Sequence, residues 1–267
     1  MDLVTDKIWQ EMSDKGLLAD HPVRYFAEIE STNSEALRLG REGAVAGTIV
    51  VADCQSKGRG RLGRFWVSPA GTGLYFSMIM RSALLPQYLS RITLAAGLAI
   101  CQALEEVGVF SQIKWPNDLL LGGKKIGGIL TETGEIRAET NTLVVLGIGL
   151  NVNTPSELFP VELRSKATSL RVHEAQNFTR GDLLAIIVSH LDKTMLSLEH
   201  GGFSEILASW RQRDAMVGKE LSWLDPEGKV VTGIALGPDD DGFLHIRDRG
   251  GQVHQVLSGD INLAGSK

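Results

Sequence analysis

The sequence predicts an α+β protein, in which a mixed β-sheet with flanking helices is followed by a small all-β barrel. Helix-like and strand-like segments alternate up to about residue 217. After that point, short apolar runs are separated by the turn sequences DPEG, PDDDG and RGG, at the spacing of small barrels. The length of 267 residues fits one large and one small domain, which we place at 1–217 and 218–267. The four runs of the barrel are 220–224, 229–236, 243–247 and 252–257.

Composition excludes several classes of protein. The chain is 43 % hydrophobic and 22 % charged, which is typical of globular proteins and not of disordered, fibrous or membrane proteins. Its formal net charge of −5 provides no overall attraction to nucleic acid or anionic lipid, so a site for a polyanion must be local. The cysteines Cys54 and Cys101 lack the spacing of a zinc site or a disulfide framework, and we expect two buried thiols in a reducing compartment.

The N-terminal segment does not have the pattern of a signal peptide. Residues 3–18 are amphipathic and carry charges throughout, and we expect a short helical extension within residues 1–22. Uncharged runs such as Leu94–Cys101 and Leu143–Leu150 are far shorter than the roughly 18 to 20 residues that cross a bilayer. These features predict a cytoplasmic protein that does not contact membranes.

The first predicted elements are a strand at Val23–Ile29 and a helix after it. Thr32 is followed three residues later by Glu35, which is the capping-box pattern, and the helix is expected to run to about Gly40. Two runs rich in β-branched, aromatic and Met residues, bounded by Gly and Pro, then predict strands. These runs are Thr48–Ala52 and Leu74–Met80.

The middle of the chain contains two predicted helices. Residues 92–104 carry no charge and are rich in small side chains, so the helix at 91–107 is expected to be buried on nearly all sides. A second helix carries apolar residues at helical spacing from Leu184 to Leu198, with Thr179 as its cap and Gly201-Gly202 as its end. Strands are expected at 112–115, 125–132 and 142–150.

The segment Gly58–Arg64 (GRGRLGR) combines three arginines with three glycines inside an acidic protein. Glycine lets backbone N–H groups approach a ligand, and arginine offers planar forks that fit phosphate or carboxylate. This combination indicates a clamp for a polyphosphate or an adenylate, although a solvated basic loop or an RNA contact has the same composition. A Walker A loop is not present in this segment.

The segment KWPND (114–118) is followed by a turn at Gly122-Gly123 and by KKIGGIL (124–130). Two glycines weaken a strand, and a ligand lying against that backbone would explain both the glycines and the lysine before them. Lys125 would offer a charge to a phosphoryl or carboxylate oxygen, and Asp118 is a candidate metal partner or proton acceptor. The alternative is an ordinary Asn-Asp turn and a surface lysine pair.

A third segment, GIGLNVN (147–153), places small residues and then two amides at the end of an apolar strand. Ligands often bind at strand ends in such sheets. An Asn-rich turn has the same pattern, so this segment adds weight only beside the other two.

Four ordered motifs of this chain are similar to those of the biotin protein ligases. They are STN at 31–33, QxxGRGRxGRxW at 55–66, KWPNDL with KKIGGIL between 114 and 130, and GIGLNVN at 147–153. The resemblance runs from about residue 25 to the C-terminus and so covers nearly the whole chain. It implies the catalytic fold of that family, which is like that of class II aminoacyl-tRNA synthetases, followed by an SH3-like barrel.

The resemblance implies a two-step reaction. Enzymes of this family join the carboxylate of biotin to the α-phosphate of Mg·ATP, release pyrophosphate, and pass the biotinyl group from biotinyl-5′-AMP to one lysine of a carrier domain. Biotin and ATP are then the substrates, and Mg²⁺ is the cofactor, held mainly by ATP phosphates. The implied partner is the biotin carboxyl carrier protein of acetyl-CoA carboxylase, and a homodimer through the central sheet is implied in the same way.

The resemblance also assigns roles to residues. The biotin-binding residues would be Ser31, Thr32, Asn33, Gln55, Gly127 and Gly128. The residues binding ATP or the adenylate would be Gly58, Arg59, Gly60, Arg61, Arg64, Trp66, Asn117, Lys125 and Asn151. The catalytic residues would be Lys125, Arg61 and Asp118, with Lys124 as the ambiguous neighbour of Lys125.

Physical chemistry agrees with this assignment. Attack of one anion on another requires that their repulsion be cancelled and their geometry fixed, which preorganised cations and Mg²⁺ do best when water is excluded. Arg59, Arg61 and Lys125 carry suitable charges. The acceptor lysine must lose a proton before it attacks, and our hypothesis is that Asp118 accepts this proton.

Three other functions are weighed against this one. A lipoate or octanoate ligase also acts on carrier lysines, but the complete GRGRxGR and KWPND segments argue against it. An RNA-binding module would leave KIGG unexplained. Some bacterial biotin ligases carry an N-terminal winged helix-turn-helix and act as repressors, whereas only residues 1–22 precede the resemblance here, so we expect no DNA binding and no repressor role.

Overall fold

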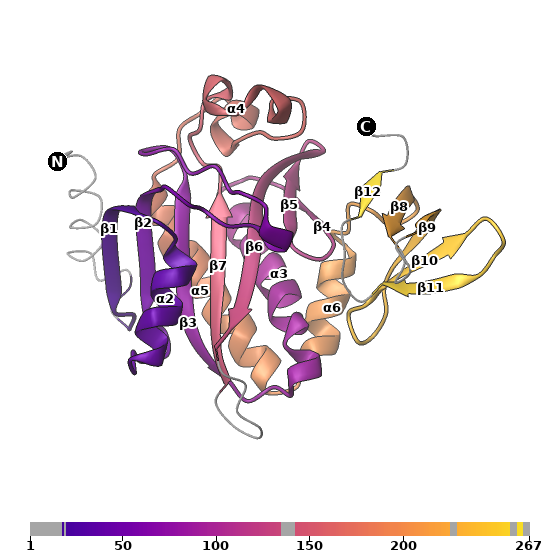
Figure 1. Cartoon of the computed structure of the whole chain (residues 1–267), viewed down its shortest axis with the longest axis horizontal. Helices are drawn as coiled ribbons and strands as arrows, with labels where there is room; N and C mark the ends of the chain where they lie inside the picture. The colour runs from indigo at the N-terminus through magenta and orange to yellow at the C-terminus, as the bar shows by residue number, and fades with distance from the viewer. Residues whose placement is uncertain (1–17, 19, 135–141, 225–228, 257–260, 264–267) are drawn as a thin grey trace.

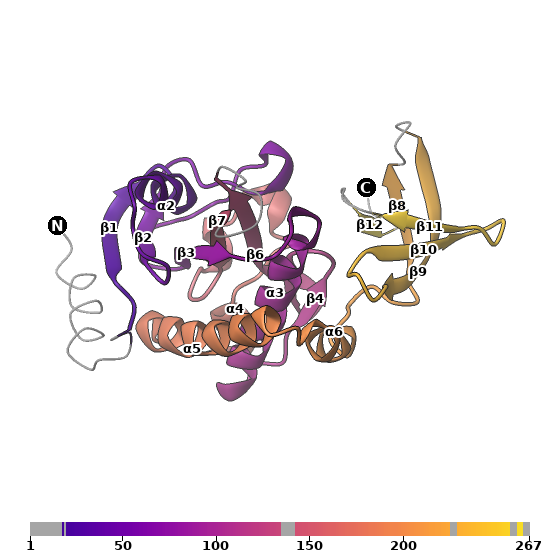
Figure 2. The same cartoon turned by 90° about the horizontal axis from the view of Figure 1, so that it is seen from below.

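The main body of the protein is a sheet of seven strands between two layers of helices (Figure 1, Figure 2). The computed structural model describes residues 18, 20–134, 142–224, 229–256 and 261–263. Neighbouring side chains of a strand point to opposite faces. Val50 therefore packs with α2 (Thr32–Arg41) on one face, while Val51 belongs to the larger core formed with α3 (Ser90–Glu106) and α5 (Arg180–Glu199) on the other.

The strands of the large sheet follow the order β1-β2-β3-β7-β6-β5-β4. The first pair is parallel and the other pairs are antiparallel. The glycine-bearing strands β6 and β7 therefore lie in the middle of the sheet, where both faces are covered. The bounds are β1 Val23–Ile29, β2 Ile49–Gln55, β3 Leu74–Ser82, β4 Gln112–Lys114, β5 Asp118–Leu121, β6 Lys124–Thr133 and β7 Thr142–Leu150.

Helix α3 is the centre of the larger core because apolar residues cover it on almost every side. At Gly97 the helix approaches the sheet closely, and an added Cβ would be in ordinary contact with Ile113 and Ile129. The remaining helices are short. They are α4 Leu170–Glu174, α6 Phe203–Arg211, and the 3₁₀ turns η1 Arg61–Gly63, η2 Pro86–Tyr88, η3 Ser156–Leu158 and η4 Val161–Leu163.

The C-terminal part is a small antiparallel sheet in the order β11-β10-β9-β8-β12. It packs directly on the main body: Trp115 Nε1 donates a hydrogen bond to the carbonyl of Gly242, and Arg91 pairs with Asp241. Among the described residues, no ladder joins β11 to β12, so the pairings do not close a barrel. The bounds are β8 Glu220–Leu224, β9 Val230–Pro238, β10 Leu244–Asp248, β11 Val253–Val256 and β12 Asn262–Leu263.

The predicted fold class is confirmed, and the predicted strands and long helices are present with small shifts at their ends. The capping box at Thr32 is wrong. The residue before the helix is Ser31, the side chain of Thr32 bonds to Gln55, and Glu35 pairs with Arg38. Thr179 does precede α5, but its side chain makes no capping hydrogen bond.

Several elements were not predicted, among them strand β5 and helices α4 and α6. Strand β5 is only four residues long and follows the Pro-Asn turn chemistry of KWPND. Helix α5 ends before Gly201-Gly202, as predicted, and helix α6 begins directly after these glycines. The amphipathic segment predicted at 3–18 lies outside the described residues, except for Leu18.

The two cysteines differ from each other. Cys101 is buried, and burial raises the pKa of its thiol to about 11. Cys54 is only partly buried, so the expectation of two buried thiols is wrong for this residue. In the described part of the chain, no helix combines the length and apolar character needed to cross a bilayer.

Candidate ligand site

Three glycines form what we call the floor of the site: Gly128 of β6 and Gly147 and Gly149 of β7. Gly128 is paired with Gly149 and Gly147 with Leu130, so all three glycines present the same face of the sheet. The space above them is filled by side chains of this chain. An added Cβ would lie 1.8 Å from Asn33 Oδ1 at Gly147 and 2.5 Å from Trp66 Nε1 at Gly149. The floor needs glycine because two polar side chains lie directly on its backbone.

The Ser-Thr-Asn motif lies at the start of α2, where it is buried beside the floor. The backbone N–H of Thr32 donates to Gln55 Oε1 at 2.9 Å, and the Thr32 hydroxyl donates to the same oxygen. Gln55 Nε2 donates in turn to Ser68 Oγ at 2.9 Å. The hydroxyl of Ser77, which is fully buried on β3, lies 2.6 Å from Asn33 Oδ1. These bonds fix the amide and hydroxyl groups that the resemblance assigns to biotin.

A buried ion pair holds the end of β2 that carries Gln55. Asp53 Oδ1 accepts from Arg180, the first residue of α5, at 2.6 Å, and both side chains are at most 10 % exposed. Arg180 also donates to the carbonyl of Gly73, and Asp53 Oδ2 accepts from the N–H of Gly71. The end of β2 and the start of β3 are thereby fastened to one helix.

The segment 58–66, which we call the arginine loop, crosses the sheet above the floor (Figure 1). Its ends are tied together, since the N–H of Trp66 donates to the carbonyl of Gly58 and that of Gly60 to the carbonyl of Arg64. Leu62 has a positive φ of 56° and its side chain is 70 % exposed. The indole N–H of Trp66 is buried without a hydrogen-bond partner in the described residues.

Three cationic side chains gather at this site, and each meets a polar partner on β5, on β6 or in the turn before β5. Lys125 Nζ lies 2.6 Å from Asp118 Oδ1 and 5.4 Å from the centre of the Trp66 ring. The guanidinium of Arg61 donates to Asn117 Oδ1 at 3.0 Å. The guanidinium of Arg59 donates to Glu132 Oε2.

Known proteins share both the sequence and the fold. The profile of the Biotin/lipoate A/B protein ligase family matches residues 25–151, and that of the Biotin protein ligase C terminal domain matches residues 218–263. A protein of Bacillus spizizenii named bifunctional ligase/repressor BirA is 37 % identical over 238 residues, which are 88 % of this chain and 72 % of that protein. The chain belongs to the biotin protein ligase family.

Further members of the biotin protein ligase family extend the likeness. The biotin–[acetyl-CoA-carboxylase] ligase of Mycobacterium tuberculosis is 32 % identical, over 88 % of this chain and 86 % of that protein. The structure of a biotin protein ligase from Aquifex aeolicus in complex with biotin and ATP superposes with a TM-score of 0.76 at 30 % identity, covering 92 % of this chain and 99 % of that one. This chain is therefore a ligase.

The structure brings most of the residues predicted for this biotin protein ligase site together. Lys125 points toward Asp118 and Trp66, whereas its neighbour Lys124 is exposed, which favours Lys125 of the two. Asn151 makes no hydrogen bond to these residues in the described part of the chain. Its side-chain amide is buried and donates a hydrogen bond to the carbonyl of Thr168.

The interpretation that a ligand lies against the KIGG backbone stays a prediction. Gly128 lies beneath the side chains of Lys125 and Trp66, and Gly127 packs against Leu119 and the carbonyl of Gly149. Close packing therefore accounts for Gly127, whereas an added Cβ at Gly128 would be in ordinary contact with Lys125 and Trp66.

Sequence reasoning missed Glu132, Ser68 and Ser77, whose side chains contact the predicted residues. One signal was available for Glu132. It follows Gly128 by four positions on a strand, so the two residues share a face of the sheet.

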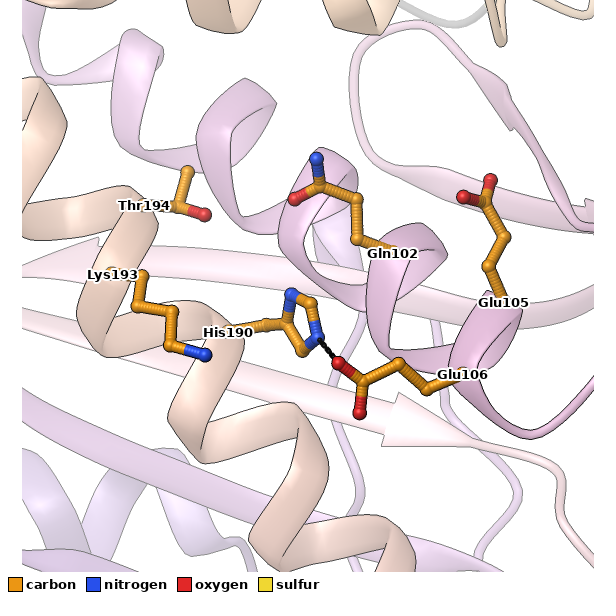
Figure 3. A pocket seen from close by; sticks show the side chains of 6 residues that line it. All are labelled: Gln102, Glu105, Glu106, His190, Lys193 and Thr194. Atoms are coloured by element: carbon orange, nitrogen blue, oxygen red, sulfur yellow. Dashed lines mark hydrogen bonds and ion pairs between the residues drawn. The ribbon is translucent and has the colours of Figure 1, made fainter.

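A cavity of about 540 Å³ lies elsewhere, between α3 and α5 (Figure 3). Figure 3 shows His190 of α5 bonded to Glu106 of α3, at 2.7 Å. Because these helices cover the face of the sheet opposite to α2, the cavity does not belong to the candidate site. Its lining consists of Gln102, Glu105, Glu106, His190, Lys193 and Thr194.

The described residues contain no group of three or more His, Cys, Asp or Glu side chains that could hold a metal ion. The carboxylate of Asp118 is engaged by Lys125. Magnesium in ATP-dependent enzymes is commonly held by substrate phosphates with one or two carboxylates. The donor groups in the described part of the chain therefore do not form a metal cage of their own.

Proposed function

We propose that this chain activates biotin with ATP to form biotinyl-5′-AMP, with release of pyrophosphate, and then transfers the biotinyl group to a lysine of a carrier protein. The observation that carries this proposal is the gathering of Arg59, Arg61 and Lys125 around one glycine floor, beside the buried Ser-Thr-Asn motif. The solved relative with bound biotin and ATP supports the same assignment.

In the first step a carboxylate attacks a phosphate, and both are anions. The three cations are already held by partners on the sheet, so little reorganisation is needed when the anions bind. The buried indole N–H of Trp66 is a further donor without an acceptor. An unsatisfied buried donor costs about 1–3 kcal/mol, and an acceptor on the bound adenylate would remove that cost. The arginine loop covers the floor and excludes water from the reacting atoms.

In the second step the lysine of the carrier attacks the mixed anhydride and expels AMP. The amine must first lose a proton, and we assign this proton to Asp118, whose carboxylate lies at the edge of the floor with a side chain 21 % exposed. Lys125 contacts Asp118 and keeps its carboxylate oriented toward the floor. The acceptor would be the biotin carboxyl carrier protein of an acetyl-CoA carboxylase in the cytoplasm, and Mg²⁺ would arrive with ATP.

The decisive experiment mixes the purified chain with biotin, Mg·ATP and a biotin carrier domain and probes the carrier with streptavidin. We expect a signal that depends on ATP and on the acceptor lysine. The same assay with lipoate, read by an antibody to lipoyl-lysine, separates the two branches of the matched family. Lipoylation without biotinylation would overturn the proposal.

The role of Asp118 is tested by separating the two steps. Asp118→Asn is expected to form biotinyl-5′-AMP at close to the parent rate and to transfer biotin about 100-fold more slowly, within the range for loss of a general base. Pyrophosphate release reports the first step, and a chase of preformed adenylate with carrier domain reports the second. An unchanged transfer rate would refute the assignment.

A further inference from the structure

Glu132 lies where the two predicted halves of the site meet. On β6, Gly128, Leu130 and Glu132 alternate with residues that face α3, such as Thr131, whose hydroxyl lies 2.8 Å from that of Thr93. Glu132 therefore shares the ligand face of the sheet with the floor. Its side chain is 25 % exposed, which leaves it partly shielded from water.

One oxygen of Glu132 joins the Ser-Thr-Asn motif to the arginine loop. Glu132 Oε2 accepts from Asn33 Nδ2 at 2.9 Å and from the guanidinium of Arg59 at 2.5 Å. Asn33 is held from other sides as well, since its Nδ2 also donates to the carbonyl of Leu130 and its Oδ1 accepts from Ser77. The carboxylate is thus anchored on a rigid strand and a buried amide, while Arg59 comes from a loop.

The exposed ion pair between Glu30 and Lys57 provides a contrast near the same loop. Its atoms are 2.6 Å apart, but both side chains are more than two-thirds exposed. Exposed pairs of this kind contribute little to stability, because water screens the charges and both side chains lose conformational freedom. Glu132 is already fixed by Asn33, so Arg59 alone loses freedom when the pair forms, and the charged hydrogen bond is correspondingly stronger.

We propose that Glu132 is a positioning residue that holds Arg59, and with it the arginine loop, over the floor before any ligand binds. A guanidinium has five N–H donors, so Arg59 keeps donors for a carboxylate or phosphate of the ligand while Glu132 retains one of them. The anionic ligand then meets a cation whose place is already set, which lowers the cost of ordering the loop on binding. That this ligand is biotin with ATP rests on the proposed function.

The first test measures the order of the loop without any ligand. Trypsin cleaves after Arg61 and Arg64 when the loop opens, and mass spectrometry identifies these cuts. Glu132→Gln keeps an oxygen that can accept from Asn33 but removes the charge. We expect these cuts to be about 3- to 10-fold faster in E132Q, with an unchanged melting temperature, as fits the loss of a partly shielded charged hydrogen bond. The matched control Glu30→Gln should change the rate less than about twofold.

A double-mutant cycle makes the test specific to the pair. Arg59→Gln should speed the same two cuts as much as E132Q does, and the variant with both changes should be cut no faster than either single variant. Rates in E132Q equal to the parent, or effects of the two changes that multiply, would overturn the inference. Because no substrate is present, these results do not depend on the proposed function.

Steady-state kinetics then test whether holding the arginine loop in place favours the binding of biotin. In E132Q we expect the KM for biotin to rise about fivefold or more while kcat stays within about twofold, since the carboxylate sets the position of Arg59 and does not touch the reacting atoms. An unchanged KM in a variant with a loosened loop would refute the role in binding. A chain that biotinylates nothing would instead fail the proposed function and leave the proteolysis result standing.

Discussion

The floor strands β6 and β7 and the arginine loop above them are both rich in glycine, but the space around their glycines differs. At Gly147 and Gly149 an added Cβ would collide with Asn33 and Trp66. At Gly63 no atom lies within 4 Å of an added Cβ, and the backbone has a φ of +72°. Gly147 and Gly149 of the floor are therefore needed for close approach, whereas Gly63 of the loop is needed for a left-handed turn.

This difference shows that glycine meets two separate physical requirements in these motifs, which are close approach of a side chain and a left-handed backbone. In the floor, a side chain costs packing energy, and the cost depends on how firmly the displaced group is held. At Gly63 in the loop, a side chain costs only backbone strain. Substitutions in the two regions should consequently separate stability from activity.

The largest effect is expected for Gly147→Ala. The new methyl group would displace Asn33, which is fixed by Ser77, Leu130 and Glu132. We expect a loss of about 3 kcal/mol in the free energy of unfolding, measured by urea denaturation, because overpacking and broken buried hydrogen bonds act together. Gly97→Ala in α3 is the matched control, since its added Cβ would be in ordinary contact and alanine favours helix. A loss below about 1 kcal/mol in G147A would contradict the packing account of the floor.

The next largest effect concerns the two adjacent lysines at the edge of the floor. Lys125→Gln should slow formation of biotinyl-5′-AMP about 100-fold or more, the usual cost of removing one preorganised donor to a developing charge. Lys124 is exposed, so Lys124→Gln should change the rate less than about twofold. Pyrophosphate release measures both rates. Equal losses in the two variants would show that charge near the floor matters more than position.

Gly149→Ala should separate activity from stability. Trp66, which the new methyl group would displace, belongs to the arginine loop and can move away without disturbing the core. We expect adenylate formation to slow about tenfold, because the indole and Lys125 lose their mutual placement. The melting temperature should fall by no more than about 4 °C, the shift expected for roughly 1 kcal/mol in a chain of this size. A collapse in stability equal to that of G147A would mean that the loop is part of the core.

Gly63→Ala should have the smallest effect. Nothing collides with its Cβ, and the only cost is a left-handed backbone, about 1–2 kcal/mol for a residue with a side chain. Since Leu62 next to it already adopts a positive φ, the loop tolerates such residues. Biotinylation rates within about threefold of the parent are expected, with faster trypsin cleavage of the loop as the sensitive readout. A tenfold loss of activity would show that the loop, like the floor, is limited by space.

The elements with strong periodicity could be predicted from the sequence, and those set by tertiary contacts could not. Strands β6 and β7 and helices α3 and α5 follow from long apolar patterns. The prediction that Thr32 caps the helix was wrong because its hydroxyl donates a hydrogen bond to Gln55, which is 23 residues away in the sequence. The spacing of Glu132 from Gly128 placed both on one face of a strand, but its contacts with Asn33 and Arg59 could be seen only in the folded protein.

The ion pair of Asp53 and Arg180 has a consequence for the order in which the chain is made. The two residues are 127 positions apart, so at about 5–20 residues per second the ribosome needs on the order of 10 s to deliver Arg180 after Asp53. Until then Asp53, whose carboxylate anchors the end of β2, lacks the guanidinium that it binds in the folded protein. The nascent protein therefore completes the anchor of this strand end only when residue 180 of 267 has been made, and a chain stalled earlier carries the Ser-Thr-Asn motif and the arginine loop without that anchor.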